Sequence, residues 1–132
     1  MTRIQFLKLW SISVGSMDAL TGVLLTFAPG SVLQLLRIPL PSQDALIFLS
    51  WIGIFVMAVG LSYALALGKN AWAEASWIFT SLVRSLVAVF LTVRILDGSL
   101  VPTWAIIVLA DACVAIVQIA ILQAGWWKEA SR

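Results

Sequence analysis

Residues 78–97 read IFTSLVRSLVAVFLTVRILD, a long apolar run with Arg84 near its middle, and this stretch decides the fold. An arginine at the centre of a membrane-spanning helix costs roughly 2.5–3.5 kcal/mol on insertion scales, so its side chain should face the protein interior and meet carboxylates. Asp18 and Asp111 each lie well inside another apolar run. The sequence therefore predicts a helical membrane bundle around a buried cluster of Asp18, Arg84 and Asp111.

The composition is far more apolar than that of a soluble domain. Of the 132 residues, 62% are hydrophobic and 11% are charged, whereas charged residues make up about 25% of a typical soluble domain. This balance indicates a single integral membrane domain over residues 1–132, with the lipid bilayer as its surroundings. The formal charge is +2, and the basic residues are spread singly, so no basic cluster favours a nucleic-acid partner.

Missing residue types limit the cofactor chemistry. The chain has no histidine and a single cysteine, Cys113, which excludes an internal disulfide, a Cys/His zinc site, a Cys-ligated iron–sulfur cluster and a His-ligated haem. We therefore expect no metal, no covalently bound cofactor and none held by His or Cys. A quinone, a carotenoid or a lipid tail packed against the helices stays open.

Four apolar runs are long enough to cross a hydrocarbon core of roughly 30 Å as helices. They cover residues 9–27, 44–67, 71–96 and 102–124. The turn at residues 68–70 is short, which favours neighbouring helices that run in opposite directions. The predicted fold is all-α, a membrane four-helix antiparallel bundle.

A short amphipathic segment separates the first two predicted helices. Pro29-Gly30 ends the first run, and residues 31–37 (SVLQLLR) can form two helical turns with one apolar side. Such a helix suits the membrane interface. A lid over a catalytic or partner-binding site is the alternative, because Pro39 and Pro41 stiffen the way into the next helix.

Small residues recur on one face of each of the first two predicted helices. These faces consist of Ser11, Gly15, Asp18 and Gly22 on the first helix, and Gly53, Met57, Gly60 and Ala64 on the second. Small side chains let helix backbones approach closely within lipid. We expect both faces to pack against other helices.

Basic residues outside the bilayer core distinguish the two sides of the membrane. One side holds Arg3, Lys8, Lys69, Lys128 and Arg132, and the other holds Arg37 and Arg94. The positive-inside rule then predicts a multi-pass protein of the inner (plasma) membrane with both termini in the cytoplasm. The interpretation of the aromatic residues is a belt near the cytoplasmic face, with Trp104 near the opposite face; its members on the cytoplasmic side are Trp10, Tyr63, Trp72, Trp126 and Trp127.

Depth along the helices places the three charged residues in one layer. With a rise of about 1.5 Å per residue, Asp18 lies about 13 Å from the outer end of its helix, Arg84 about 18 Å and Asp111 about 13 Å. Gln118 shares a helix face with Asp111. Two ionised aspartates beside one arginine leave a net charge of −1, which favours protonation of one carboxylate. The layer is either a polar clasp that fixes helix register or a site for a proton or a ligand headgroup.

Several short motifs occur in a recognisable order along the chain. They are a first helix that ends in Pro29-Gly30, then LRIP, a glycine-rich second helix, a third helix centred on Arg84 and closing in LDG, and Asp111 within the fourth. Over about the whole chain this pattern resembles the DoxX-like small four-helix membrane proteins. The resemblance implies an inner-membrane bundle, often without known activity, with some members associated with quinone-linked oxidoreductase complexes. It also implies that Arg84 and Asp111 are polar positions typical of the family.

Three classes of function are compatible with these features. The favoured one is a small non-catalytic subunit or accessory protein of a larger membrane complex, because the chain lacks redox ligands and has small-residue helix faces. A proton-linked transporter using Asp18, Arg84 and Asp111 is the alternative, and it would require a homo-oligomer, since four helices are few for a substrate path. A membrane enzyme acting on a lipid or isoprenoid is the third, although no nucleophile–base pair supports it.

Overall fold

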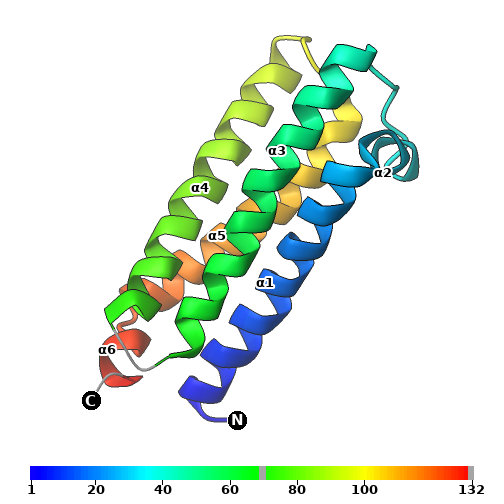
Figure 1. Cartoon of the computed structure of the whole chain (residues 1–132). Coiled ribbons are helices and arrows are strands. Elements are labelled where there is room, and N and C mark those ends of the chain that lie inside the picture. Colours follow the sequence, from blue (N-terminus) through cyan, green and yellow to red (C-terminus); the bar gives the residue numbers. More distant parts are fainter. Residues whose placement is uncertain (69–70, 131–132) are drawn as a thin grey trace. The chain divides into compact units, whose positions relative to one another are not determined.

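The computed structural model describes residues 1–68 and 71–130, and these residues form helices and no strand. The elements in chain order are α1 (Arg3–Phe27), α2 (Pro29–Leu35), α3 (Gln43–Ser62), η1 (Tyr63–Leu67), α4 (Ala71–Leu96), η2 (Pro102–Trp104), α5 (Ala105–Gln123) and α6 (Trp126–Ala130), as labelled in Figure 1. The all-α prediction is confirmed. The predicted turn at residues 68–70 includes Lys69 and Asn70, which lie outside the described residues.

Within the described residues, four helical stretches are long and apolar enough to cross a membrane. They are Arg3–Phe27, Gln43–Leu67, Ala71–Leu96 and Pro102–Gln123, with 25, 25, 26 and 22 residues. At 1.5 Å per residue, even the shortest is about 33 Å long, which exceeds a typical hydrocarbon core. The chain forms two compact units, residues 1–67 and 68–132, and each contains two of these stretches.

The first helix begins earlier than the apolar pattern indicates, at Arg3 rather than at residue 9. Thr2 is the N-cap: its hydroxyl oxygen accepts a hydrogen bond from the Gln5 backbone N–H at 3.2 Å, and the Gln5 side chain accepts one from the Thr2 N–H at 2.9 Å. This reciprocal pair satisfies two N–H groups that a helix start otherwise leaves open. The capping box therefore extends α1 through the basic segment before the apolar run.

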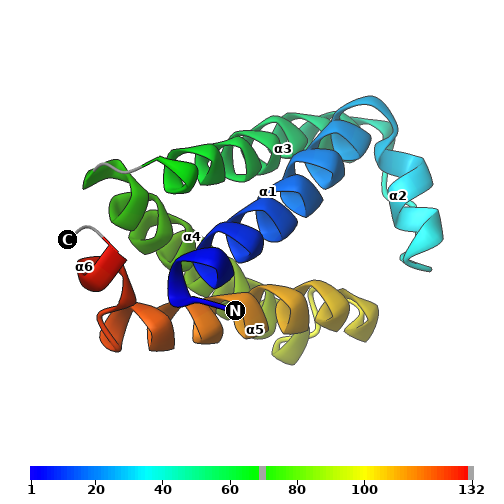
Figure 2. The same cartoon turned by 90° about the horizontal axis from the view of Figure 1, so that it is seen from below.

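In the first unit, glycines bring α1 and α3 into close contact. A Cβ atom on Gly15 would lie 2.9 Å from the carbonyl oxygen of Gly60, and one on Gly22 would lie 2.6 Å from that of Gly53. Residue numbers rise along one helix as they fall along the other, so this pair runs in opposite directions, and Figure 2 shows the two helices side by side. The buried residues of α1 include the predicted small face, and the buried residues of α3 are Gly53 and Gly60.

The connection between α1 and α3 contains the short helix α2, which begins two residues before the predicted segment 31–37. Pro29 occupies the first turn of α2, where its missing N–H costs no hydrogen bond, and the helix ends at Leu35 instead of residue 37. Ser42 caps α3, and its hydroxyl oxygen accepts a hydrogen bond from the Ala45 N–H at 3.3 Å. After Ser62 the predicted helix tightens into the 3₁₀ turn η1.

The second unit pairs α4 with α5. The buried residues of α4 recur every three or four positions from Ala73 to Ala88, which is the pattern of a helix packed along one side. A turn follows α4: Asp97 accepts a hydrogen bond from the Ser99 N–H at 2.8 Å, and Gly98 has φ +81°. After α5, Gly125 with φ +73° ends the helix and the chain continues into α6.

Candidate functional site

The centre of the candidate site is an ion pair between the two long helices of the second unit. Arg84 lies near the middle of α4 and is only 3% exposed. Its Nη1 donates a hydrogen bond to Oδ1 of Asp111 on α5 at 2.6 Å. The Asp111 side chain is 18% exposed. Two charged residues that are far apart in the sequence are therefore in direct contact across the helix pair.

The short separation identifies a charge-assisted hydrogen bond. Such bonds are shorter and roughly twice as strong as bonds between neutral groups, and their strength rises where water is excluded. The same exclusion makes either charge costly if it is left alone. Both charges are therefore neutralised only when α4 and α5 pack in the register that brings Arg84 and Asp111 together.

A second polar contact lies further along the same helix faces. Gln118 follows Asp111 by about two turns of α5, and its Nε2 lies 2.9 Å from Oγ of Ser81, 3.1 Å from Oγ1 of Thr80 and 3.4 Å from the carbonyl oxygen of Trp77. The side chains of Gln118 and Thr80 are fully buried and that of Ser81 is nearly so. An amide that reaches three acceptors on the facing helix fixes both the separation and the rotation of the pair.

Two tryptophans close the end of this face near α6. The rings of Trp77 and Trp127 meet edge to face, with centroids 5.4 Å apart and an interplanar angle of 75°. Trp127 is 7% exposed, and among the described residues no acceptor meets its indole N–H. The belt interpretation is wrong for Trp127, because α6 turns this ring inward. Tyr63, 1% exposed, is likewise buried instead of lying at a lipid-facing surface.

The predicted site residues thus fall into two groups. Arg84, Asp111 and Gln118 belong to the second unit, where Arg84 and Asp111 are in contact and Gln118 lies on the same faces. Asp18 belongs to the first unit, on the buried side of α1. Its contact with Arg84 stays a prediction. Sequence reasoning missed Thr80 as the partner of Gln118, although a Thr-Ser pair one turn before a central arginine is a visible signal.

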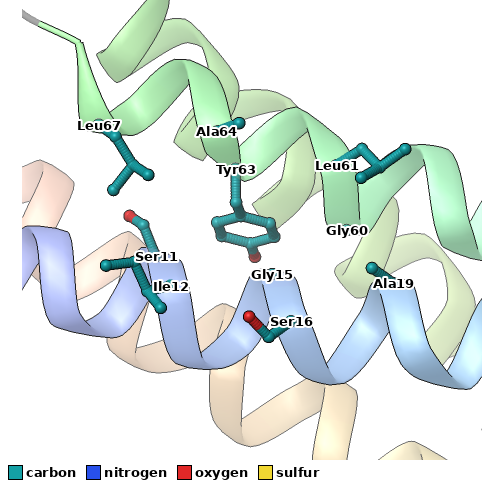
Figure 3. Close-up of a pocket in the computed structure, with 10 residues that line it drawn as sticks. All are labelled: Ser11, Ile12, Gly15, Ser16, Ala19, Gly60, Leu61, Tyr63, Ala64 and Leu67. Carbon is teal, nitrogen blue, oxygen red and sulfur yellow. The ribbon is translucent and has the colours of Figure 1, made fainter.

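The first unit carries a groove between α1 and the end of α3. Its volume is about 240 Å³, and Figure 3 shows residues of α1 on one side and of α3 and η1 on the other. The lining is mostly apolar or small, and it contains Ser11, Ile12, Gly15, Ser16, Ala19, Gly60, Leu61, Tyr63, Ala64 and Leu67. The Ser11 hydroxyl donates to the carbonyl oxygen of Leu7 at 2.7 Å. The groove therefore suits hydrocarbon better than a charged ligand.

In the part of the chain that the structure describes, no three His, Cys, Asp or Glu side chains gather as ligands for a metal ion. Cys113 is exposed on α5. Comparison with protein-family models, with curated proteins and with solved structures found no match to this chain.

Proposed function

We propose that this chain is a small non-catalytic integral membrane subunit or accessory protein of a larger membrane complex. In this proposal its four long helices cross the inner (plasma) membrane as an antiparallel bundle, α2 lies in the interface, and both termini are cytoplasmic. Four described helices of spanning length support the membrane assignment. The excess of basic residues on one side supports the orientation.

The observation that carries the proposal is the contact between Arg84 and Asp111. Both charges are engaged with each other at 2.6 Å, and the nearby amide of Gln118 is engaged with the facing helix. Polar groups engaged in this way hold helices in register. The arrangement favours a packing role over catalysis.

The outer surface of the helices supports a role within lipid or beside other subunits. On α3, the large side chains of Phe48, Trp51 and Phe55 are 60%, 59% and 59% exposed. They lie away from the glycine face, which is buried. Lipid tails, neighbouring subunits, a quinone or a carotenoid are all apolar enough to cover such a surface. The groove of the first unit, whose lining is mostly apolar or small, is a second candidate site for such a molecule.

The proposal keeps Asp18 as a third member of the polar layer. Asp18 lies on the buried side of α1, with the small residues that α1 packs through. Its expected depth matches that of Asp111 when the helices cross the bilayer side by side. A carboxylate at that depth needs a partner, and Arg84 is the basic residue expected there.

A proton-linked transporter is the second candidate, because the Asp111 side chain is 18% exposed whereas Arg84 is almost fully buried. A carboxylate with partial access can exchange a proton if its arginine partner moves away. Variants Asp18→Asn and Asp111→Asn separate the two candidates. Normal assembly with lost uptake would favour transport, whereas impaired assembly of Asp111→Asn, in which Arg84 loses its counter-charge, would support the subunit role.

Extraction in a mild detergent tests the proposed function itself. The tagged chain is expressed in its native host and purified from the membrane. Native mass spectrometry then measures the mass of the assembly that purifies with it. The subunit role predicts a defined assembly with other membrane polypeptides at fixed stoichiometry. A homo-oligomer alone would contradict it and would favour transport.

A further inference from the structure

The segment that joins the first two long helices presents an unpaired arginine at a fixed position. Leu33 of α2 and Ile38 after it are 2% and 5% exposed, so this connection is anchored in the first unit. Arg37 lies between them and is exposed. Among the described residues, no carboxylate, ring or hydrogen-bond acceptor meets its guanidinium.

The backbone at Arg37 has a conformation that glycine adopts more readily. Its φ is +57°, the Ile38 N–H donates to the carbonyl oxygen of Leu33 at 2.8 Å, and the Arg37 N–H donates to that of Gln34 at 3.0 Å. This is a helix C-terminal turn of the Schellman kind, where glycine is the usual residue at the left-handed position. An arginine there carries more backbone strain than a glycine would.

The apolar side chains around this turn are unusually exposed. Phe27 and Leu35 are each 83% exposed and Leu40 is 51% exposed. The segment follows one stretch of spanning length and precedes another. In a bilayer it therefore lies at the boundary, where such side chains enter the acyl region and a guanidinium remains at the level of the phosphates.

We propose that the α1–α3 connection is a lipid-docking surface in which Arg37 binds the phosphate of an anionic phospholipid. The inference rests on the proposed membrane-spanning function. Phe27, Leu35 and Leu40 contact the acyl chains, and the strained turn holds the guanidinium toward the headgroup layer. A single cation with no internal counter-ion selects a lipid with net negative charge over a zwitterionic one.

Arg94 provides a matched comparison within the same chain. Its Nη1 lies 3.3 Å from Oδ2 of Asp97, and its guanidinium lies over the Phe90 ring at 5.5 Å. Arg94 therefore already has a counter-ion and an aromatic contact, whereas Arg37 has neither. Loss of Arg94 should leave the lipid preference unchanged.

The test uses the full chain in detergent with equal amounts of phosphatidylglycerol and phosphatidylcholine, and native mass spectrometry measures the lipid retained. The wild type should prefer phosphatidylglycerol, and Arg37→Ala and Arg37→Gly should weaken that preference about fivefold, the effect of one basic residue near an anionic surface. Arg37→Lys and Arg94→Ala should behave as the wild type. Arg37→Gly should also melt no lower than the wild type, because glycine relieves the strained turn.

Two results would overturn the inference. One is a wild-type protein without lipid preference, and the other is an Arg37→Gly variant that retains as much phosphatidylglycerol as the wild type. Alkaline carbonate extraction of the membranes separates this failure from that of the proposed function. If carbonate releases the wild-type chain, the membrane-spanning function itself is wrong. If the chain stays in the membrane while Arg37 variants keep their lipid, only the docking surface is wrong.

Discussion

Gly22 and Gly53 meet so closely that neither position has room for a methyl group. A Cβ atom on Gly22 would lie 2.3 Å from the backbone nitrogen of Met57, and one on Gly53 would lie 2.8 Å from the carbonyl oxygen of Gly22. Backbone atoms cannot move aside as the end of a flexible side chain can. The contact between α1 and α3 therefore depends on the absence of side chains at these positions.

Alanine at Gly22 or Gly60 should destabilise the first unit. We expect losses of about 1–3 kcal/mol in the free energy of unfolding, the usual cost of overpacking, because each new methyl group would push the two backbones apart. Gly30→Ala is the control, since its Cβ would lie 3.7 Å from Cδ2 of Leu40, an ordinary contact. Unfolding in detergent by SDS titration measures each variant. Equal stability of Gly22→Ala and Gly30→Ala would contradict the close contact.

Replacing Gln118 by leucine should weaken the pairing of α4 and α5. Hydrogen bonds between membrane helices contribute about 0.6–1.7 kcal/mol, and Gln118→Leu removes the donor that reaches Thr80 and Ser81. Gln123→Leu is the matched control, because Gln123 is exposed on the same helix. The measurement is the free energy of unfolding of both variants in the same detergent. An equal loss of unfolding free energy in Gln118→Leu and Gln123→Leu would contradict the structural role of Gln118.

Two substitutions of Trp127 should differ in their effect on the stability of the protein. Trp127→Phe keeps an aromatic ring against Trp77 and removes an N–H that no described residue accepts, so stability should be nearly unchanged. Trp127→Ala removes the ring and should cost about 3–5 kcal/mol, as for buried aromatic residues elsewhere. Thermal melting of the two variants gives the comparison. A large loss in Trp127→Phe would show that the indole N–H has an acceptor.

The turn after α4 contains a carboxyl group, Asp97, whose contribution to stability should depend on pH. Hydrogen bonds from the Ser99 side chain and backbone, with a smaller contribution from Arg94, hold the pKa of Asp97 below its ordinary value of 3.8. A lowered folded-state pKa adds stability above the unfolded-state pKa, and that stability is lost as the pH falls through the folded-state value. Ser99→Ala should therefore raise the pKa of Asp97 toward 3.8.

Carbon NMR of the Asp97 carboxyl group, titrated with acid in detergent micelles, measures this pKa. Arg94→Gln should raise the pKa less than Ser99→Ala, because the arginine is the lesser cause. An unchanged pKa in Ser99→Ala would mean that the turn does not hold the carboxylate as described.

The long helices could be predicted because the length of an apolar run determines whether a helix can span a bilayer. The predicted range of about 71–96 agrees with α4, Ala71–Leu96. The start of α1 was missed because the reciprocal bonds of Thr2 and Gln5 lie outside the apolar pattern. Helix caps act through polar side chains, so the spacing of apolar residues does not indicate where a capped helix begins.

The site could be predicted in part for a similar reason. A lone Arg84 in an apolar run requires a carboxylate, so charge alone names Asp18 and Asp111 as candidate partners. The structure shows the contact with Asp111. The inward position of Trp127 depends on the left-handed turn at Gly125, which lies between the end of α5 and the start of α6. Composition places a tryptophan near an interface, whereas backbone geometry decides whether it faces lipid or protein.

The central claim is that the charges of Arg84 and Asp111 hold α4 and α5 together, and a double-mutant cycle tests it most directly. The variants are Arg84→Met, Asp111→Leu and the double variant, with unfolding followed in detergent. Removing one partner of a buried pair typically costs about 3–5 kcal/mol, because the other charge is left uncompensated. The account predicts such a loss in each single variant, with much of it recovered in the double variant. Losses that simply add, or single variants as stable as the wild type, would contradict the clasp.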